Sequence, residues 1–419
     1  MNDFEQQIQQ LQNRLLALDA ERETVLKQLS ELGQRKSEQQ SEFEKIIDDA
    51  KINHYSSTHE KINLFRDLFK GRTDVYPKRY ESKKTGKSGY TPVCANEWRP
   101  NVCHKPRIKC SDCQFRVYSP VTDQVIANHL AGNDYSGKAN SDFVAGIYPL
   151  LSNEHCWFLA VDFDEESWMD DIKAFLSACK DNKIPCAIER SRSGKGGHVW
   201  IFFTEPVTAM DARKLGAFLL TSAMDLHPEL GFKSYDRLFP NQDTMPKGGF
   251  GNLIALPLQK KARENGNSVF INENFTPYPD QWAYLASIFK ITPTQLAVVI
   301  KKAEQQNKIL GVRLPIEEDD KEPWKLSPSR KPKDFMLSDP LPKILPIVLG
   351  NQIFIAKAEL PKLVQSKIIQ IAAFQNPEFY KKQALRQSTH ETPRVISCAE
   401  YFLNISLCPE VAGKNYYCF

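Results

Sequence analysis

The sequence predicts an α+β protein, and three observations predict it. Between residues 125 and 290, short apolar runs of strand length alternate with amphipathic helical segments. The first 50 residues have a separate helical pattern, and the last 75 look helical and then irregular. With 419 residues, 41% of them hydrophobic, the chain is long enough for two or three domains with a substantial core. The expected divisions are an N-terminal helix at 1–50, a basic, cysteine-containing segment at 55–124, the central region at 125–290 and a helical C-terminal region at 291–419.

The first 50 residues predict one long helix with an apolar seam. Apolar residues alternate steps of four and three, and Arg22 interrupts one position. This spacing is that of a heptad repeat. It fits a helix that packs on its own protein as well as a coiled coil that makes a homodimer. The seam consists of Phe4, Ile8, Leu11, Leu15, Leu18, Val25, Leu29 and Leu32.

Charge is distributed unevenly along the chain. Residues 1–50 hold 6 Lys/Arg against 11 Asp/Glu, whereas residues 60–119 hold 14 against 6. All 14 of these basic residues lie between residues 61 and 116, and a concentrated basic segment of this kind is typical of proteins that bind polyanions. Residues 71–92 are rich in Gly, Pro, Lys and Ser and predict a loop or linker.

No apolar run approaches the roughly 20 residues that span a bilayer, and the acidic, glutamine-rich start is unlike a signal peptide. We therefore expect a cytoplasmic protein with no membrane partner. Ten cysteines in such a protein would be reduced and would not form a disulfide framework.

Four cysteines fall within twenty residues. Cys94, Cys103, Cys110 and Cys113 have the spacing C-x8-C-x6-C-x2-C, and His104 is a spare ligand. The closing "CSDC" places two thiolates on one turn, as in structural zinc sites. The pattern predicts a structural Zn²⁺ site, and the alternative is four unrelated reduced cysteines.

The central region predicts strands at "CWFLAVDFD", "IPCAIERS" and "HVWIFF". An amphipathic helix follows Ser167 in "SWMDDIKAFLSACK". A second helix, "TAMDARKLGAFLLTSAMDLH", is opened by a capping box from Thr208 to Asp211.

Two aspartates lie at the end of the first of these strands. Alternate residues of a strand point to the same side, so Asp162 and Asp164 would project together, about 7 Å apart along the chain. Paired carboxylates repel each other unless a cation lies between them, and Mg²⁺ or Mn²⁺ prefers such oxygen ligands. The pair predicts a metal site, although D-x-D by itself also occurs for other reasons.

A glycine-rich turn precedes the strand that opens at His198, in "ERSRSGKGGHVWIFF". Its three glycines between residues 194 and 197 allow a backbone whose N–H groups face a phosphate, with Lys195 and Arg192 as countercharges. The order of residues excludes a P-loop. A histidine that opens a strand is by itself more often structural.

A third acidic candidate lies in "KSYDRLFPNQD", where Asp236 follows an aromatic residue and Asp243 comes seven later. Together with the histidine and the basic turn, three carboxylates indicate two-metal phosphoryl transfer to a nucleotide. The next run, "FGNLIALPLQKKAR", predicts a strand that ends in three basic residues, Lys260, Lys261 and Arg263.

The motifs "VDFD", "SGKGGH" and "YD", in that order, resemble those of the archaeo-eukaryotic primase superfamily. The sequence is most similar to primases of TOTE conflict systems and to CRISPR-associated primase-polymerases, through strings such as "LFRDLFKGRTDVYPKRY", "GYTPVCANEW" and "KPRIKCSDC". The similarity extends from about residue 61 to about residue 400. It implies a catalytic core at 125–290 with an RRM-like antiparallel sheet, which makes DNA or RNA on a single-stranded template with or without a primer. For such an activity, Lys260, Lys261 and Arg263 are candidates for template contacts.

The resemblance also implies roles for individual residues. It places metal binding on Asp162, Asp164 and Asp236, with Asp236 preferred to Asp243 because it directly follows an aromatic residue. It places contacts to the triphosphate of the incoming NTP or dNTP on three residues of the glycine-rich segment: Ser193, Lys195 and His198.

The resemblance further implies a prokaryotic defence or CRISPR-linked setting, with a helicase, a nuclease or CRISPR adaptation proteins as partners. Related proteins often continue into a helicase and nuclease, so this chain is expected to be a stand-alone or truncated primase module. Two alternatives remain, a non-catalytic single-strand-binding adaptor and a metal-dependent nuclease. Paired acids give an adaptor no advantage, and a nuclease has no need of a triphosphate-sized basic turn.

Overall fold

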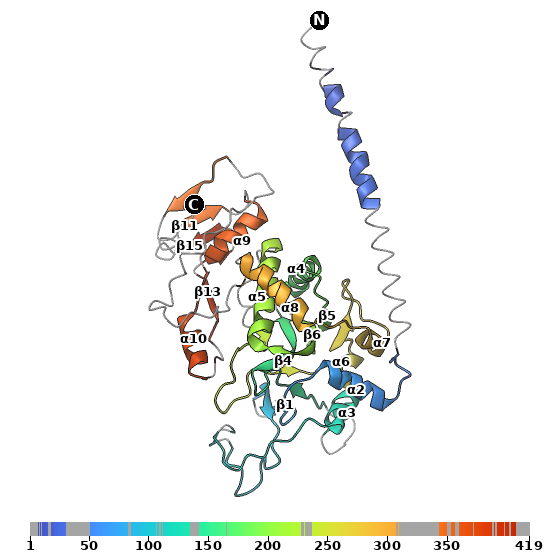
Figure 1. Cartoon of the computed structure of the whole chain (residues 1–419), viewed down its shortest axis with the longest axis vertical. Coiled ribbons are helices and arrows are strands. Elements are labelled where there is room, and N and C mark those ends of the chain that lie inside the picture. Colours follow the sequence, from blue (N-terminus) through green and yellow to red (C-terminus); the bar gives the residue numbers. More distant parts are fainter. Residues whose placement is uncertain are drawn as a thin grey trace.

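The structure is a computed structural model (Figure 1). It describes a nearly continuous central portion of the chain and shorter stretches on both sides. The described residues are 7, 9, 11–15, 18–30, 51–82, 85–105, 107, 108, 110, 112–134, 142–164, 166–227, 230, 237–306, 309, 343–349, 353–356, 360–371, 373–387, 389, 392–397, 399–401 and 404–407.

A five-stranded sheet lies at the centre of the molecule, with the strand order β7-β4-β6-β5-β9. Every neighbouring pair is antiparallel, which confirms an α+β protein with an antiparallel sheet. The predicted strands at "CWFLAVDFD" and "HVWIFF" form its two longest members. The strands are β4 (His155–Phe163), β5 (Ala187–Arg190), β6 (Gly197–Thr208), β7 (Leu238–Phe239) and β9 (Val269–Ile271).

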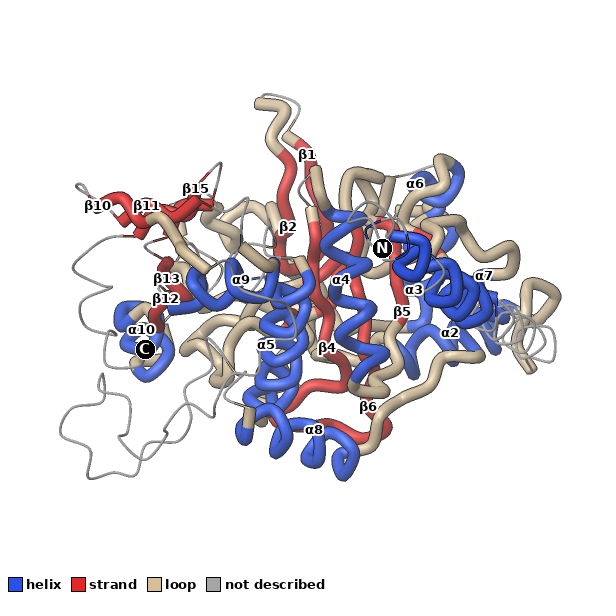
Figure 2. Tube along the Cα trace, turned by 90° about the horizontal axis from the view of Figure 1, so that it is seen from above, coloured by secondary structure: helices blue, strands red, loops and turns tan. Residues whose placement is uncertain are grey.

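Two helices cover one face of this sheet. Helices α4 (Trp168–Asp181) and α5 (Ala209–Leu226) pack against each other and against β4 and β6 (Figure 2). From β4, the ring of Phe163 points to this side and lies 5.6 Å from the ring of Phe175. As predicted, Thr208 caps α5, because its hydroxyl accepts the N–H of Asp211.

The opposite face is covered by aromatic side chains next to helix α2 (Thr58–Leu68). The ring of Phe69, which ends this helix, contacts the rings of Trp200, Phe202 and Phe270. The sheet is therefore buried on both faces, which explains why "FLAV" and "VWIFF" are continuous apolar runs. Shorter elements surround this face: β1 (Pro77–Glu81), β2 (Ser88–Pro92), α3 (Asp123–Ala131), β3 (Gly146–Ile147), β8 (Ile254–Ala255), α6 (Lys260–Glu264) and α7 (Gln281–Ala286). Helix α8 (Pro293–Gln305) instead packs against α5 and β6.

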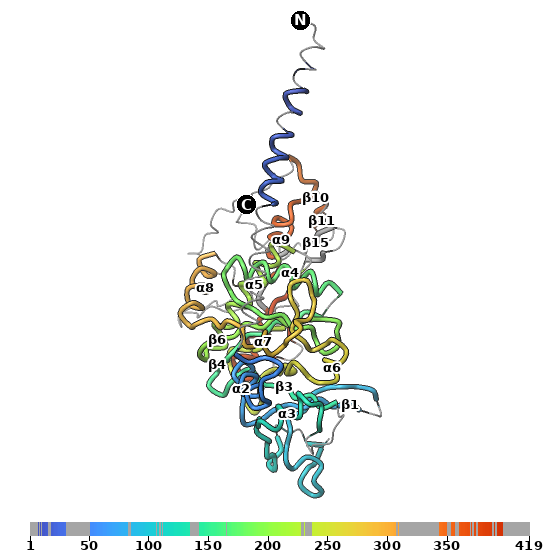
Figure 3. Tube along the Cα trace, turned by 90° about the vertical axis from the view of Figure 1, so that its right-hand side faces the viewer, coloured from blue at the N-terminus to red at the C-terminus, as the bar shows by residue number. Residues whose placement is uncertain are grey.

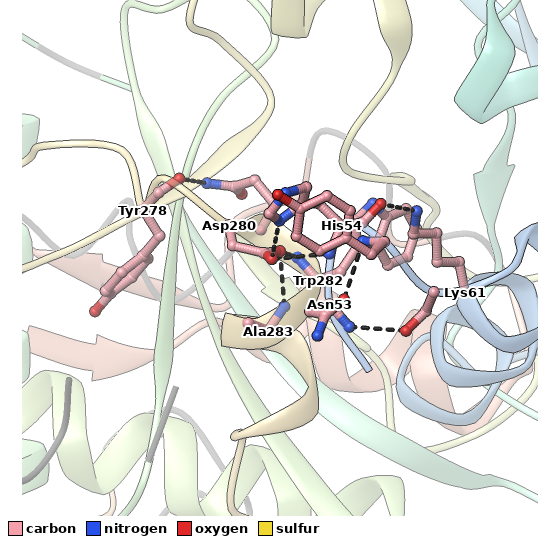
Figure 4. Close-up of polar contacts among 10 residues, drawn as sticks. Asn53, His54, Lys61, Tyr278, Asp280, Trp282 and Ala283 are labelled. Carbon is pink, nitrogen blue, oxygen red and sulfur yellow. Dashed lines mark hydrogen bonds and ion pairs between the residues drawn. The ribbon is translucent and has the colours of Figure 1, made fainter. Parts of the chain in front are cut away.

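The segment before α2 is attached to the start of α7 through Asp280 (Figure 4). The Asp280 carboxylate caps α7 by accepting the N–H groups of Trp282 and Ala283. It also accepts the backbone N–H of His54 at 2.8 Å. Burial opposes ionisation of Asp280, but these N–H donors outweigh it and lower its pKa. The pairing fixes the point from which the N-terminal segment leaves the domain.

The described positions between residues 7 and 30 are helical and exposed, in agreement with the predicted helix. Three residues of the predicted seam (Phe4, Ile8 and Leu32) and residues 31–50 lie outside the described residues. The remaining seam residues, which are 47–67% exposed, are Leu11, Leu15, Leu18, Val25 and Leu29.

The prediction of a helical region at 291–419 is wrong for the described residues beyond 343, which combine helices with strands (Figure 2). Among them, α9 lies close to the strand β15 (Figure 3). The strands are only three or four residues long, so their sequences lack the alternation that identifies longer strands. Helix α9 packs on α5. Most of the predicted boundary at 315–345 lies outside the described part. The elements are β10 (Ile347–Leu349), β11 (Ile353–Ala356), α9 (Lys362–Ile371), β12 (Ala373–Gln375), α10 (Pro377–Ala384), β13 (Val395–Ser397), β14 (Ala399–Tyr401) and β15 (Asn404–Leu407).

His129 of α3 is buried and joins two loops of the core. Its Nδ1 accepts the N–H of Ala145 at 3.1 Å, and its Nε2 lies 2.9 Å from the carbonyl oxygen of Pro257. Burial lowers the pKa of His129 to about 4, which holds the ring neutral. In the unfolded chain, a histidine has a pKa of about 6.5 and binds a proton more readily than the buried His129 does. The neutral His129 therefore contributes its full stabilisation above pH 6.5, and this stabilisation is lost as the pH falls towards 4.

We therefore expect the free energy of unfolding to depend less on pH below pH 6.5 in His129→Gln than in the wild type. Between pH 7.5 and pH 4.5, the wild type should lose about 2 kcal/mol more of its free energy of unfolding than the variant. Urea denaturation at both pH values measures this difference. An equal gap between the two proteins at both pH values would contradict the assignment.

Candidate active site

Three neighbouring strands bring Asp162, His198 and Glu189 side by side. In the register of the sheet, His198 of β6 is directly opposite Asp162 of β4 and also directly opposite Glu189 of β5. Directly opposite residues point to the same face of a sheet. The Nε2 atom of His198 lies 3.6 Å from Oδ1 of Asp162, and its Nδ1 lies 2.9 Å from Oε2 of Glu189. The structure thus brings two of the predicted site residues together.

The two carboxylates determine the charge of His198. Burial by itself lowers the pKa of His198, but Glu189 and then Asp162 outweigh it and raise the pKa to about 9. The ring is therefore cationic at pH 7. Because the pKa is about 6.5 in an unfolded chain, this ion pairing stabilises the fold fully below pH 6.5 and is lost as the pH rises through about 9.

The glycine-rich turn packs against the end of β4. A side chain at Gly196 would place its Cβ 2.5 Å from the carbonyl oxygen of Phe163 and 3.0 Å from Cα of Asp164, so only glycine permits this approach. Gly194 has a φ of 75°, in the left-handed region. Within the turn, the side chains of Ser193 and Lys195 are exposed. The turn that was predicted to face a phosphate therefore lies beside the aspartates.

Asp164 is the first residue after β4, and its side chain is 51% exposed. Its carboxylate forms an ion pair with Arg237, which immediately precedes β7. In β7, Leu238 pairs with Val161, so this segment runs beside the end of β4. Asp236, the predicted third carboxylate, lies outside the described residues.

Asp243, the alternative to Asp236, is committed to a structural ion pair. It is 7% exposed and contacts the guanidinium of Arg213, a fully buried residue of α5. Gln383 of α10 donates to the other oxygen of Asp243 at 3.0 Å. Both oxygens of this carboxylate therefore bind groups that join α5 to α10.

Arg192, a predicted countercharge in the turn, is directed to another carboxylate. Its Nη2 lies 2.7 Å from Oδ2 of Asp142, which Arg79 also approaches at 3.4 Å. The guanidinium thus fastens the turn to the loop before β3. It is 32% exposed, so part of it still reaches the surface.

The basic residues predicted for the template lie on helix α6, so the prediction of a strand that ends in them is wrong. The strand β8 is only two residues long, and Gln259 caps the helix by accepting the N–H of Ala262. From this helix, Arg263 donates to the backbone oxygen of Leu130 at 2.8 Å. Of the three residues, only Lys261 is classed as exposed.

A cavity of about 370 Å³ lies beside α2. The β4 strand has a bulge between Cys156 and Phe158 that redirects Trp157, which lines the cavity. The ammonium of Lys70 lies 4.3 Å from the Trp157 ring centroid. Lys70 comes from the basic segment at 61–116, as do two other lining residues, Arg66 and Arg72.

The four predicted zinc ligands and His104 all line one small cavity in the loop after β2. The Sγ atom of Cys94 accepts the N–H of Val117 at 3.3 Å, a bond that suits a thiolate. The number and chemistry of these side chains fit a structural zinc ion.

No three His, Cys, Asp or Glu side chains are arranged to hold a metal ion in the part of the chain that the structure describes. The four cysteines therefore line one cavity, but their side chains are not arranged around a common metal position. At the strand end, Asp162 and Asp164 are 24% and 51% exposed, so their hard oxygen donors are accessible to a divalent cation.

Reasoning from the sequence missed two charged residues of this site, Glu189 and Arg237. Glu189 is 2% exposed in the strand "AIER", and a lone acid in such a short apolar strand was the available signal. Arg237 directly follows the motif "YD" and carried no signal of its own.

The site thus combines two acids, a cationic histidine and a glycine-rich turn at one end of an antiparallel sheet. A family model described as "TOTE conflict system, Archaeo-Eukaryotic Primase domain" matches residues 60–299, more than half of the chain. The chain belongs to this archaeo-eukaryotic primase family. At the level of the family, it is a nucleotidyltransferase of the primase-polymerase type.

Among solved structures, the chain is similar to the polymerase domain of Mycobacterium tuberculosis ligase D in complex with DNA. The two sequences are 13% identical, the match covers 61% of this chain and 91% of that domain, and the TM-score is 0.27. A search of curated proteins found no match. Within the described residues, none of the helices combines the length and the apolar character that crossing a membrane requires.

Proposed function

We propose that this protein adds nucleotides to a growing strand on a single-stranded DNA or RNA template, with or without a primer, in a prokaryotic conflict setting. The observation that supports this most strongly is the juxtaposition of Asp162, His198 and the glycine-rich turn at one end of β4 and β6. A triphosphate needs cations and N–H donors, and its activation needs clustered carboxylates.

In this proposal, each group at the strand end has a separate task. Asp162, Asp164 and Asp236 would hold divalent Mg²⁺ or Mn²⁺ ions, whose charge would neutralise the triphosphate and activate the attacking 3′-hydroxyl. His198 presents a positive charge next to Asp162 and would orient the phosphates without transferring a proton. The exposed side chains of the turn, Ser193 and Lys195, would contact the same triphosphate.

The template strand would follow the basic segment at 61–116. Lys70, Arg66 and Arg72 surround a cavity whose wall includes Trp157, and single strands bind where cations alternate with stackable aromatic rings. On α6, Lys260 and Lys261 remain candidates for phosphate contacts. Arg263 is a weaker candidate, because it is bound to the backbone of Leu130.

Primer-free synthesis on single-stranded DNA tests the proposal. Labelled ribo- and deoxyribonucleotides are supplied with Mg²⁺ or Mn²⁺, and the Asp162→Ala/Asp164→Ala variant is run in parallel. Products that the wild type makes and the variant does not would establish template-directed synthesis. Extension of a supplied primer, without synthesis in its absence, would limit the activity to polymerisation.

Two other results would identify the competing functions. Template binding without incorporation in either metal would replace the proposal with a single-strand-binding adaptor. Metal-dependent shortening of a labelled strand without added nucleotides would replace it with a nuclease.

We also propose that the cysteine cavity holds one structural Zn²⁺ ion. Purified protein should contain about one zinc per chain, and Cys110→Ser/Cys113→Ser should lose it, because four thiolate ligands bind zinc in a closed site. Elemental analysis measures the zinc content. Cys156→Ser, in the buried core far along the chain from this loop, is the matched control. Zinc that persists in the double variant would contradict the site.

We propose that the exposed seam of the N-terminal helix joins two copies of the chain. Light scattering after size exclusion should give twice the mass of one chain, and Leu18→Glu/Val25→Glu should halve it, because charges in an a/d seam prevent coiled-coil packing. Gln28→Glu adds charge to the same helix outside the seam and should leave the mass unchanged. A monomeric wild type would contradict the proposal.

A further inference from the structure

Glu189 is a buried carboxylate in the middle of the sheet. It is 2% exposed, on a strand that lies between β6 and β9. Burying a charge costs free energy, and an apolar residue of similar volume at such a place is often at least as stabilising. Stability by itself therefore gives a weak reason for a glutamate here.

The hydrogen bonds of Glu189 converge on His198. Its Oε2 accepts the Nδ1 of His198 and the Nε1–H of Trp200, both at 2.9 Å. Its other oxygen, Oε1, accepts the hydroxyl of Ser268 at 3.3 Å. The carboxylate is thus held at both oxygens and cannot rotate away from the imidazole without losing these bonds.

This bracing fixes the imidazole. Because Nδ1 donates to Glu189, the orientation of the ring is fixed. The Nε2 atom then points towards the C-terminal end of β4, where it lies 3.6 Å from Oδ1 of Asp162. Trp200 lies perpendicular to the ring at a centroid distance of 6.1 Å and limits its tilt. The same arrangement orients imidazoles that ligate metals, where a carboxylate behind the ring sets its direction.

We propose that Glu189 is a positioning residue that holds the imidazole of His198 with Nε2 directed at the triphosphate of the incoming nucleotide. The inference rests on the proposed function, since it supplies the reason for the orientation of His198. Glu189 itself would not touch the nucleotide.

A double-mutant cycle with Glu189→Gln, His198→Ala and both changes together tests this. Glutamine keeps the shape and can still accept from Trp200, but it removes the charge that holds the ring. We expect Glu189→Gln to raise the KM for nucleotide about tenfold with a smaller change in kcat, because an imidazole held in one orientation contributes mainly to binding. In the His198→Ala background, the same change should have almost no effect, since its route to the nucleotide is gone.

Binding of an α,β-imido nucleoside triphosphate, which cannot be incorporated, is measured by calorimetry for the same four proteins. Glu205→Gln, at an exposed position of β6, is the matched control and should change neither quantity. If the effects of Glu189→Gln and His198→Ala multiply independently, Glu189 is merely structural and the inference is wrong.

The experiments also distinguish an error in the inference about Glu189 from an error in the proposed polymerase function. A wild type that incorporates no nucleotide refutes the polymerase proposal, and the calorimetric cycle then decides the role of Glu189 by itself. A wild type that also fails to bind the triphosphate analogue overturns the inference.

Discussion

Replacing Asp162 with asparagine is expected to lower nucleotide incorporation about a thousandfold or more while the protein remains folded. The carboxylate is 24% exposed at the end of β4, where a divalent cation can reach it, and it faces the cationic His198. Losing one charged ligand removes several kcal/mol of stabilisation from developing phosphate charge, and about 4 kcal/mol corresponds to a thousandfold.

The matched control is Asp170→Asn on α4. Asp170 is 66% exposed and forms a surface ion pair with Lys173, so its loss should leave incorporation within about twofold of the wild type. Single-turnover incorporation rates and thermal melting are measured for both variants. Comparable activity in the two variants would remove Asp162 from the site.

Asp243→Asn is expected to destabilise the fold by about 3 kcal/mol without reducing the activity of the folded molecules. The change leaves the fully buried guanidinium of Arg213 without its carboxylate, and breaking a buried pair by removing one partner costs about 3–5 kcal/mol. Urea denaturation measures the stability, and incorporation is assayed at a temperature where the variant stays folded.

The double variant Arg213→Met/Asp243→Leu replaces the pair with apolar side chains and should recover most of the lost stability. A thousandfold loss of activity in folded Asp243→Asn would instead make Asp243 the third carboxylate of the site. The experiment therefore decides whether Asp243 belongs to the site, on grounds that are independent of the motif.

Several elements could be predicted because their signals are local. The nine-residue strand β4 and the helix α5 have continuous patterns, and the cap of α5 at Thr208 involves residues only three apart. The glycine-rich turn could be recognised for the same reason, because the conformation of its backbone requires the glycines that occur between residues 193 and 197.

The interaction partners of individual charged side chains could not be predicted from local signals. In the sequence, Arg263 and Asp243 cannot be distinguished from residues that bind a ligand. In the structure, Arg263 binds the backbone of Leu130 and Asp243 binds Arg213. Trp157 lies in an apolar run, but a bulge redirects it to a cavity wall. Each outcome depends on a partner from a distant part of the chain.

The sequence by itself determined the family motifs, the main strands and helices, and the acids at the end of β4, because each depends on neighbouring residues. Only the tertiary structure decided that β6 lies between β4 and β5, which places His198 between Asp162 and Glu189. Strand order is set by how the sheet buries its two faces against α2, α4 and α5, and that packing is not encoded in any single segment.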